Sequence, residues 1–84
     1  MSGTAKPPEL FFAIAVRLYR LQLEMSQEEL ALKIEMKPSE LSRIESGRRN
    51  PTLRMMTRVA KGLGVPSSRL LLVAERLEAV IDVP

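Results

Sequence analysis

The sequence contains no cysteine and no histidine, and it has no long hydrophobic run. Without these two residues the chain can form no disulfide, lacks the commonest zinc ligands and has neither thiol nor imidazole for catalysis. The apolar stretch 10–16 is too short to span a bilayer and is followed by Arg17 and Arg20. We therefore predict a protein with no metal, no cofactor and no membrane segment, compatible with a reducing cytoplasm.

The length and composition fit one small folded domain. The chain has 84 residues, of which 45% are hydrophobic and 27% are charged. This is typical of a soluble globular protein with a marginal core. We expect residues 1–8 to be a flexible leader, because they offer little to bury. The domain itself is predicted to cover residues 9–66, with a C-terminal helical element over 67–84.

The first predicted helix, 9–23, carries more apolar surface than a small domain needs on one side. One apolar row at helical spacing is expected to face the core and consists of Phe12, Val16 and Tyr19. A neighbouring row with the same spacing consists of Ile14, Leu18 and Leu21. This second row predicts that another surface covers part of the helix.

Two short helical patterns follow between Ser26 and Gly47. The first covers 27–34 and begins with Ser26 and Glu29 in the spacing of a capping box. The second covers 38–45, with Pro38 in the first turn, where proline is tolerated. Only the segment 35–37 separates the two patterns, so the helices must cross steeply, as in a helix-turn-helix.

This stretch resembles the helix-turn-helix of the Cro and phage-repressor (XRE-type) family. The family's unit maps onto residues 27–46, with its small residue on Ala31 and its apolar positions on Leu30, Ile34, Met36, Leu41 and Ile44. The resemblance continues to about Val65 and implies an all-α, compact, lambda-repressor-like domain of five helices. Where the family has glycine at a left-handed turn position, this sequence has Glu35, at a cost of about 1 kcal/mol.

A buried ion pair is also implied by the resemblance. Arg20 stands where the family has an arginine in its first helix, and Glu45 stands where it has the acidic partner. The alternative is that both residues are surface charges that do not interact.

The same resemblance places the base-reading positions on Pro38, Ser39 and Arg43. The guanidinium of Arg43 can donate two hydrogen bonds to guanine, Ser39 can bond a base or a phosphate, and Pro38 offers only apolar contact. Glu40 would repel phosphate unless it meets a cytosine amino group or pairs with Lys37 or Arg43. The alternative is that these residues form an ordinary solvated face.

Phosphate contacts are expected around this helix. In the family a glutamine at the position of Gln27 contacts the DNA backbone, and long cations beside the reading helix fix register. The candidates are Gln27, Lys37, Ser42, Arg48, Arg49 and Asn50. Residues 33–61 hold eight basic and three acidic residues, whereas the rest of the chain has five basic and seven acidic ones. Arg54 and Arg58 are expected to extend this basic surface.

The last two predicted helices complete the domain. One follows a Thr52 cap and ends before Gly62 or Gly64, with its inward positions at Leu53, Met56, Val59, Ala60 and Leu63. The other reaches about Ile81, and its broad apolar stripe predicts a dimer interface made of Leu70, Leu71, Val73, Leu77, Val80 and Ile81. The alternative is that this stripe packs on the first helix.

The favoured function is sequence-specific regulation of transcription by a cytoplasmic homodimer on a roughly palindromic site in double-stranded DNA, without enzymatic activity. A controller protein of a restriction-modification system is preferred over a phage-type repressor or an antitoxin. A protein-interaction module without DNA readout is the alternative class, supported by Pro38 and Glu40 on the reading face. A further partner, such as a toxin or RNA polymerase, is left open.

Overall fold

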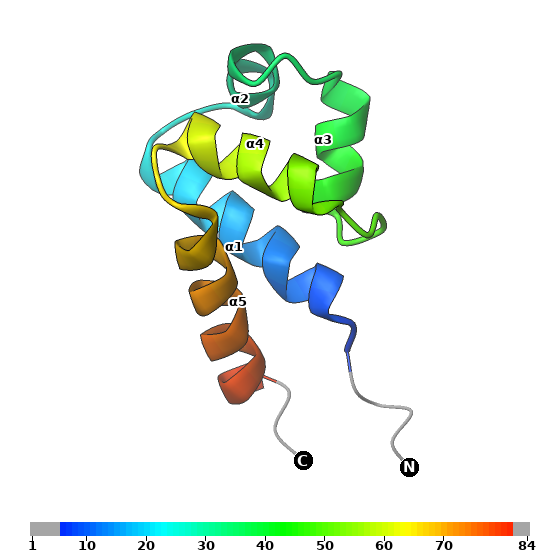
Figure 1. Cartoon of the computed structure of the whole chain (residues 1–84), viewed down its shortest axis with the longest axis vertical. Coiled ribbons are helices and arrows are strands. Elements are labelled where there is room, and N and C mark those ends of the chain that lie inside the picture. Colours follow the sequence, from blue (N-terminus) through cyan, green and yellow to red (C-terminus); the bar gives the residue numbers. More distant parts are fainter. Residues whose placement is uncertain (1–5, 82–84) are drawn as a thin grey trace.

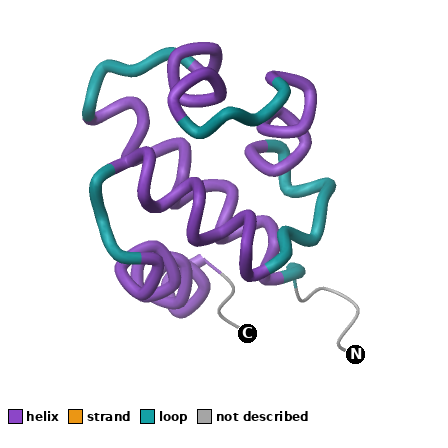
Figure 2. Tube along the Cα trace, turned by 45° about the horizontal axis from the view of Figure 1, so that its top comes forward, coloured by secondary structure: helices purple, strands orange, loops and turns teal. Residues whose placement is uncertain are grey.

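The computed structural model of the chain describes residues 6–81. Within them lie the helices α1 (Pro8–Gln22), α2 (Gln27–Lys33), α3 (Pro38–Glu45), α4 (Leu53–Leu63) and α5 (Ser67–Ile81) (Figure 1). No strand occurs in this part of the chain (Figure 2). The predicted all-α fold of five helices is therefore confirmed. Residues 1–5 of the predicted leader and residues 82–84 of the predicted C-terminal element lie outside the described residues.

The helix ends follow from local hydrogen bonds. The Ser26 hydroxyl accepts from the Glu29 amide at 3.0 Å while the Glu29 carboxylate accepts from the Ser26 amide at 2.7 Å, so the predicted capping box is confirmed. Thr52 caps α4 by accepting from the Met55 amide at 3.1 Å. Gly64 ends α4 with a left-handed φ of 76°.

The start of α1 corrects one predicted boundary. Pro8 is the first residue of the helix, so the predicted leader 1–8 extends one residue too far. The fixed φ of proline suits this position, and its missing amide hydrogen costs nothing there.

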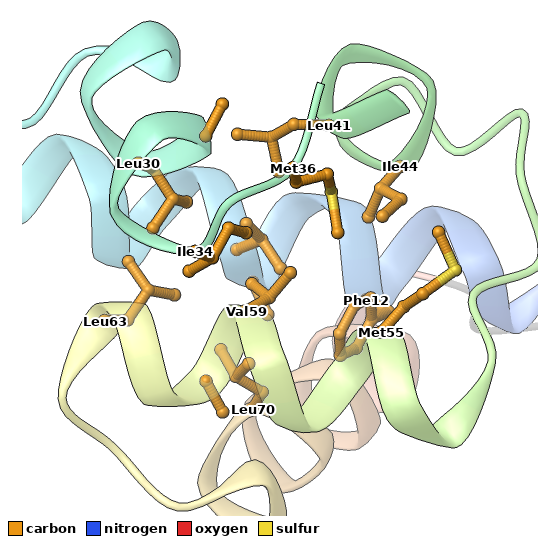
Figure 3. Close-up of a cluster of buried hydrophobic side chains, with 14 of the residues drawn as sticks. Phe12, Leu30, Ile34, Met36, Leu41, Ile44, Met55, Val59, Leu63 and Leu70 are labelled. Carbon is orange, nitrogen blue, oxygen red and sulfur yellow. The ribbon is translucent and has the colours of Figure 1, made fainter. Parts of the chain in front are cut away.

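The core is built between α1, α4 and the helix-turn-helix. Figure 1 shows α2 and α3 at one end of the molecule and α5 at the other, with α1 and α4 between them. The largest side chains with almost no exposed surface are Phe11, Val16, Leu30, Leu41, Ile44, Val59 and Leu70. They meet in one continuous cluster that joins all five helices (Figure 3). By the usual value of about 25 cal/mol per Å² of buried apolar surface, such a cluster is the main stabilising contribution.

The close approach of α2 and α4 depends on Gly62. A Cβ atom at this residue would lie 2.3 Å from Cγ2 of Ile34 and 2.9 Å from Cδ1 of Leu30. The missing side chain therefore lets the end of α2 rest directly on α4.

Two predicted positions differ from the structure. Leu53 is 68% exposed, whereas Met55 is buried, so the prediction for the inward face of α4 was wrong in its first turn. On α1, Phe12 and Val16 are buried and Tyr19 packs partly buried against the core, as predicted. Leu70 has no exposed surface and packs in the core, so it cannot belong to a dimer interface in this fold.

Apolar surface remains on α1 and α5 although the two helices pack together extensively. On α1 the exposed large apolar side chains are those of Leu18 and Leu21, which belong to the predicted second row. On α5 the exposed large apolar side chains are those of Leu71, Leu72, Val80 and Ile81. Within residues 6–81, no helix combines the length and the hydropathy that crossing a membrane requires.

Candidate nucleic-acid interface

The turn between α2 and α3 fixes how the two helices cross. Glu35 adopts a left-handed conformation with φ 55°, at the position where the resemblance implies one. The next amide, of Met36, donates to the Ala31 carbonyl at 2.9 Å, and the Met36 side chain is buried in the core. The turn is therefore held in place both by this backbone hydrogen bond and by the burial of Met36, its one apolar side chain.

Arg58 of α4 holds the same turn from outside. Its Nη2 group donates to the carbonyl of Ile34 at 2.5 Å and to that of Glu35 at 2.7 Å. A cation at this position also interacts favourably with the negative, C-terminal end of the α2 dipole. Sequence reasoning placed Arg58 on the basic surface and missed this role, because the contact spans more than 20 residues and leaves no local pattern.

A buried network joins α1, α2 and α3 behind the motif. The Arg20 guanidinium donates to both carboxylate oxygens of Glu45, at 2.8 and 2.9 Å, and also to the Met25 carbonyl at 2.9 Å. Gln27 donates to Glu45 at 3.1 Å. The side chains of Arg20 and Glu45 are 12% and 2% exposed. The predicted buried ion pair is confirmed, and it sets the orientation of α3 against α1.

The outward side of α3 carries the predicted contact residues. Pro38, Ser39, Ser42 and Arg43 are all exposed, as is Lys37 just before the helix. Their spacing puts Ser39, Ser42 and Arg43 on neighbouring positions of one helical face. The side chains predicted to read bases thus lie together and are open to a partner.

Glu40 forms an exposed ion pair with a residue that was not expected. Its Oε2 lies 3.7 Å from Nη1 of Arg49, in the loop after α3, and it forms no salt bridge with Lys37 or Arg43. This pair partly offsets the negative charge that Glu40 would present to phosphate, and Arg48 and Asn50 of the same loop are exposed.

A small polar hollow of about 200 Å³ lies beside α3, where this helix faces α1 and the start of α2. It is lined by Arg17, Arg20, Gln27, Ser42, Glu45 and Ser46. Arg17 is exposed and was not among the predicted contacts. Its spacing of three residues from Arg20 on one helix is the signal that could have placed it beside the predicted contacts Gln27 and Ser42.

Metal binding finds no support in the described part of the chain. Within residues 6–81 no group of three or more acidic side chains is arranged to hold a metal ion. The only resolved pKa shift there is that of Glu29, whose carboxylate pKa is lowered, first by the hydrogen bond from the Ser26 backbone and then by that with its side chain. This shift belongs to helix capping rather than to catalysis.

The fold and this surface define a helix-turn-helix DNA-binding protein of the kind that regulates transcription. The chain belongs to the helix-turn-helix family, since the family profile matches residues 16–70. No curated protein matches the chain in sequence.

Several solved structures share the fold. The hypothetical transcription factor NHTF from Neisseria is 33% identical, with a TM-score of 0.77 over 88% of this chain and 86% of that chain. The restriction-modification controller protein C.Esp1396I, solved as a tetramer in complex with its natural 35 base-pair operator, is 25% identical, with a TM-score of 0.80 over 87% of this chain and 96% of that chain. The clp gene regulator ClgR from Corynebacterium glutamicum reaches a TM-score of 0.86 at 24% identity, over 90% of this chain and 81% of that chain, which shows the fold alone.

Proposed function

We propose that the protein regulates transcription by binding, as a homodimer, a roughly palindromic operator in double-stranded DNA. The observation that carries this proposal is the exposed polar face of α3, held in position by the buried pair of Arg20 and Glu45. A major groove admits one α-helix and presents a different pattern of donors and acceptors for each base pair. Enzymatic activity forms no part of this function.

Within the interface, bases and phosphates are contacted by different residues. Arg43 reads guanine through two hydrogen bonds, Ser39 bonds a neighbouring base, and Pro38 touches a thymine methyl group. The phosphate contacts come from Gln27, Lys37, Ser42, Arg48, Arg49 and Asn50, and Arg17 adds a cation beside Gln27. These backbone contacts fix the register of α3 in the groove without reading sequence.

Dimerisation follows from the uncovered apolar surface of α5. Leu71, Leu72, Val80 and Ile81 remain exposed, and Val73 and Leu77 are only partly buried, although α5 packs on α1. A two-fold axis through this surface pairs the same patch of each copy. It would set the two α3 helices about 34 Å apart, on successive turns of one face of the DNA.

Among regulators of this kind, we favour a controller protein of a restriction-modification system acting in the cytoplasm. The similarity to C.Esp1396I, solved on its operator, supports this choice over a phage-type repressor or an antitoxin. The ion pair of Glu40 with Arg49 weakens the case for an interaction module, since that carboxylate was one of its two supports.

Selection of binding sites from random-sequence DNA with the purified chain tests the proposal. We expect enrichment of one roughly palindromic site, and an affinity that falls by about 0.9 log units per log unit of salt for each phosphate neutralised. A pool that stays random, or binding to all sequences alike, would contradict sequence-specific regulation.

A further inference from the structure

A second hollow, of about 410 Å³, lies where the end of α2 meets the second half of α4. Its lining consists of Lys33, Ile34, Glu35, Arg58, Lys61 and Gly62. It is separate from the exposed face of α3, and none of its residues is among the proposed DNA contacts. The close packing of Gly62 on Ile34 brings the cations of α2 and α4 around one space.

The hollow has an excess of positive charge. Three cations and one carboxylate line it, and none of Lys33, Arg58 and Lys61 forms an ion pair with any residue of the described chain. Arg58 uses only its Nη2 group, for the carbonyls of Ile34 and Glu35. Its Nε and Nη1 groups donate to no atom of residues 6–81, so they remain available to an acceptor.

We propose that this hollow binds a phosphate-bearing anion. A phosphate group carries about −1.5 to −2 charges near neutral pH and offers three strong acceptor oxygens, which match the net charge of the lining and its unused donors. Guanidinium and ammonium groups form short, charge-assisted hydrogen bonds with such oxygens. The volume also falls in the range of about 300–1,000 Å³ that is usual for small-ligand sites.

Two sources can supply this chemistry. One is a small phosphate ester free in solution, and the other is a DNA backbone phosphate at the edge of an operator. Glu35 is separated from the first residue of α3 by two residues, so the hollow lies at the turn that leads into the proposed reading helix. The inference goes beyond the proposed function, and its first test does not depend on DNA binding.

The first test is a titration of the ¹⁵N-labelled full chain with pyrophosphate at constant ionic strength. We expect saturating shifts of the amide signals of Lys33, Glu35, Lys61 and Gly62. The double variant Lys33→Gln with Lys61→Gln is expected to lose at least about tenfold in affinity. Arg58 is left intact because it holds the turn. The control, Arg69→Gln with Arg76→Gln on α5, removes the same charge and should bind as the wild type does.

The second test identifies the source, using the selected operator as a duplex with long flanks and as one trimmed to the core site. For a DNA phosphate, the Lys33 and Lys61 variant binds only the long duplex more weakly than the wild type. For a free ester, DNA affinity is unchanged while pyrophosphate binding is lost. The proposal is overturned if pyrophosphate gives only linear shifts, alike in both double variants, and DNA affinity does not change either. A chain that binds no DNA refutes the proposed function, and the pyrophosphate titration alone then decides the hollow.

Discussion

The carboxylate of Glu45 is almost entirely removed from water and accepts from Arg20 through both oxygens. The substitution Glu45→Ala would leave the guanidinium of Arg20, whose side chain is only 12% exposed, without its carboxylate partner and with the Met25 carbonyl as its remaining acceptor. We expect it to lower the free energy of unfolding by about 3–5 kcal/mol, measured by urea denaturation.

A paired control separates this charge effect from lost packing. Replacing both residues at once, Arg20→Met with Glu45→Leu, leaves no orphaned charge and should cost clearly less than Glu45→Ala alone. A wild-type unfolding midpoint for Glu45→Ala would show that the pair does not stabilise the fold.

Glu29 gives the capping box a dependence on pH. Its folded-state pKa lies below the ordinary value of 4.5, chiefly because the Ser26 backbone donates to the carboxylate. The resulting stabilisation is complete above pH 4.5 and is lost as the pH falls through the lowered folded-state pKa. We expect the stability difference between wild type and Glu29→Gln to shrink in that acid range, measured by urea unfolding at several pH values. A difference that stays constant with pH would argue against the hydrogen bond.

Among single-residue contacts, those marked by a local spacing or by the family's order of positions could be predicted from the sequence, and the others could not. The capping box depends on residues three apart, and the pair of Arg20 and Glu45 is implied by the order of positions around the motif. The hydrogen bonds of Arg58 to the carbonyls at the turn join α4 to a segment that is distant in the sequence. Nothing in the neighbouring sequence marks that arginine as different from Arg54.

As an element, α3 is expected to carry the base preference of the protein. Because Arg43 is exposed, Arg43→Ala should leave the fold intact. We expect it to weaken binding to the selected operator by about 1–3 kcal/mol and to relax the preference at one base position, measured by mobility shift and repeated selection. Arg54→Ala, exposed on α4, is the matched control and should keep the preference. An unchanged preference in Arg43→Ala would remove this residue from base readout.

The contact between α2 and α4 gives a second prediction for helices. Gly62→Ala would push a methyl group into Ile34 and Leu30, which are both buried. We expect strain of about 1–3 kcal/mol, only partly offset by the gain of about 1 kcal/mol in helix propensity. The unfolding midpoint in urea should therefore fall. Thr57→Ala, on the exposed side of α4, is the control, and a more stable Gly62→Ala would mean that the two helices can move apart freely.

Helix boundaries were more predictable than helix faces. The range 38–45 was predicted for α3 and is observed, because a short turn and a proline delimit its start. On α4 the 3.6-residue period admits two neighbouring phases in the first turn, and packing selects Met55 rather than Leu53. On α5 the apolar stripe does not reveal whether a residue such as Leu70 faces its own chain or another.

For the whole molecule, we expect self-association through α5. Val80 is 76% exposed, so Val80→Glu should leave the monomer folded while placing a charge in the proposed interface. Sedimentation equilibrium should show a dimer for the wild type at micromolar concentration and a weaker or absent dimer for this variant. Leu32→Glu, at an 82% exposed residue of α2, is the control. A wild type that stays monomeric would contradict the dimer.

The five helices could be predicted from their helical patterns, and their lambda-repressor-like arrangement from the family resemblance. The position of the proposed interface rests on that resemblance and on the basic excess of residues 33–61. The hollow between α2 and α4 could not be predicted. It arises because α2 and α4 meet at Gly62. Lys33 and Lys61 are far apart in the sequence, so no local pattern indicates that they line one hollow.

The extensive contact between α1 and α5 joins the two helices that are farthest apart in sequence. During translation α1 leaves the ribosome well before α5 is made, so part of its apolar surface stays uncovered while three other helices are synthesised. Transiently exposed surface of this kind attracts chaperones and promotes aggregation. Nascent chains of this protein should therefore be most vulnerable in the interval before α5 docks.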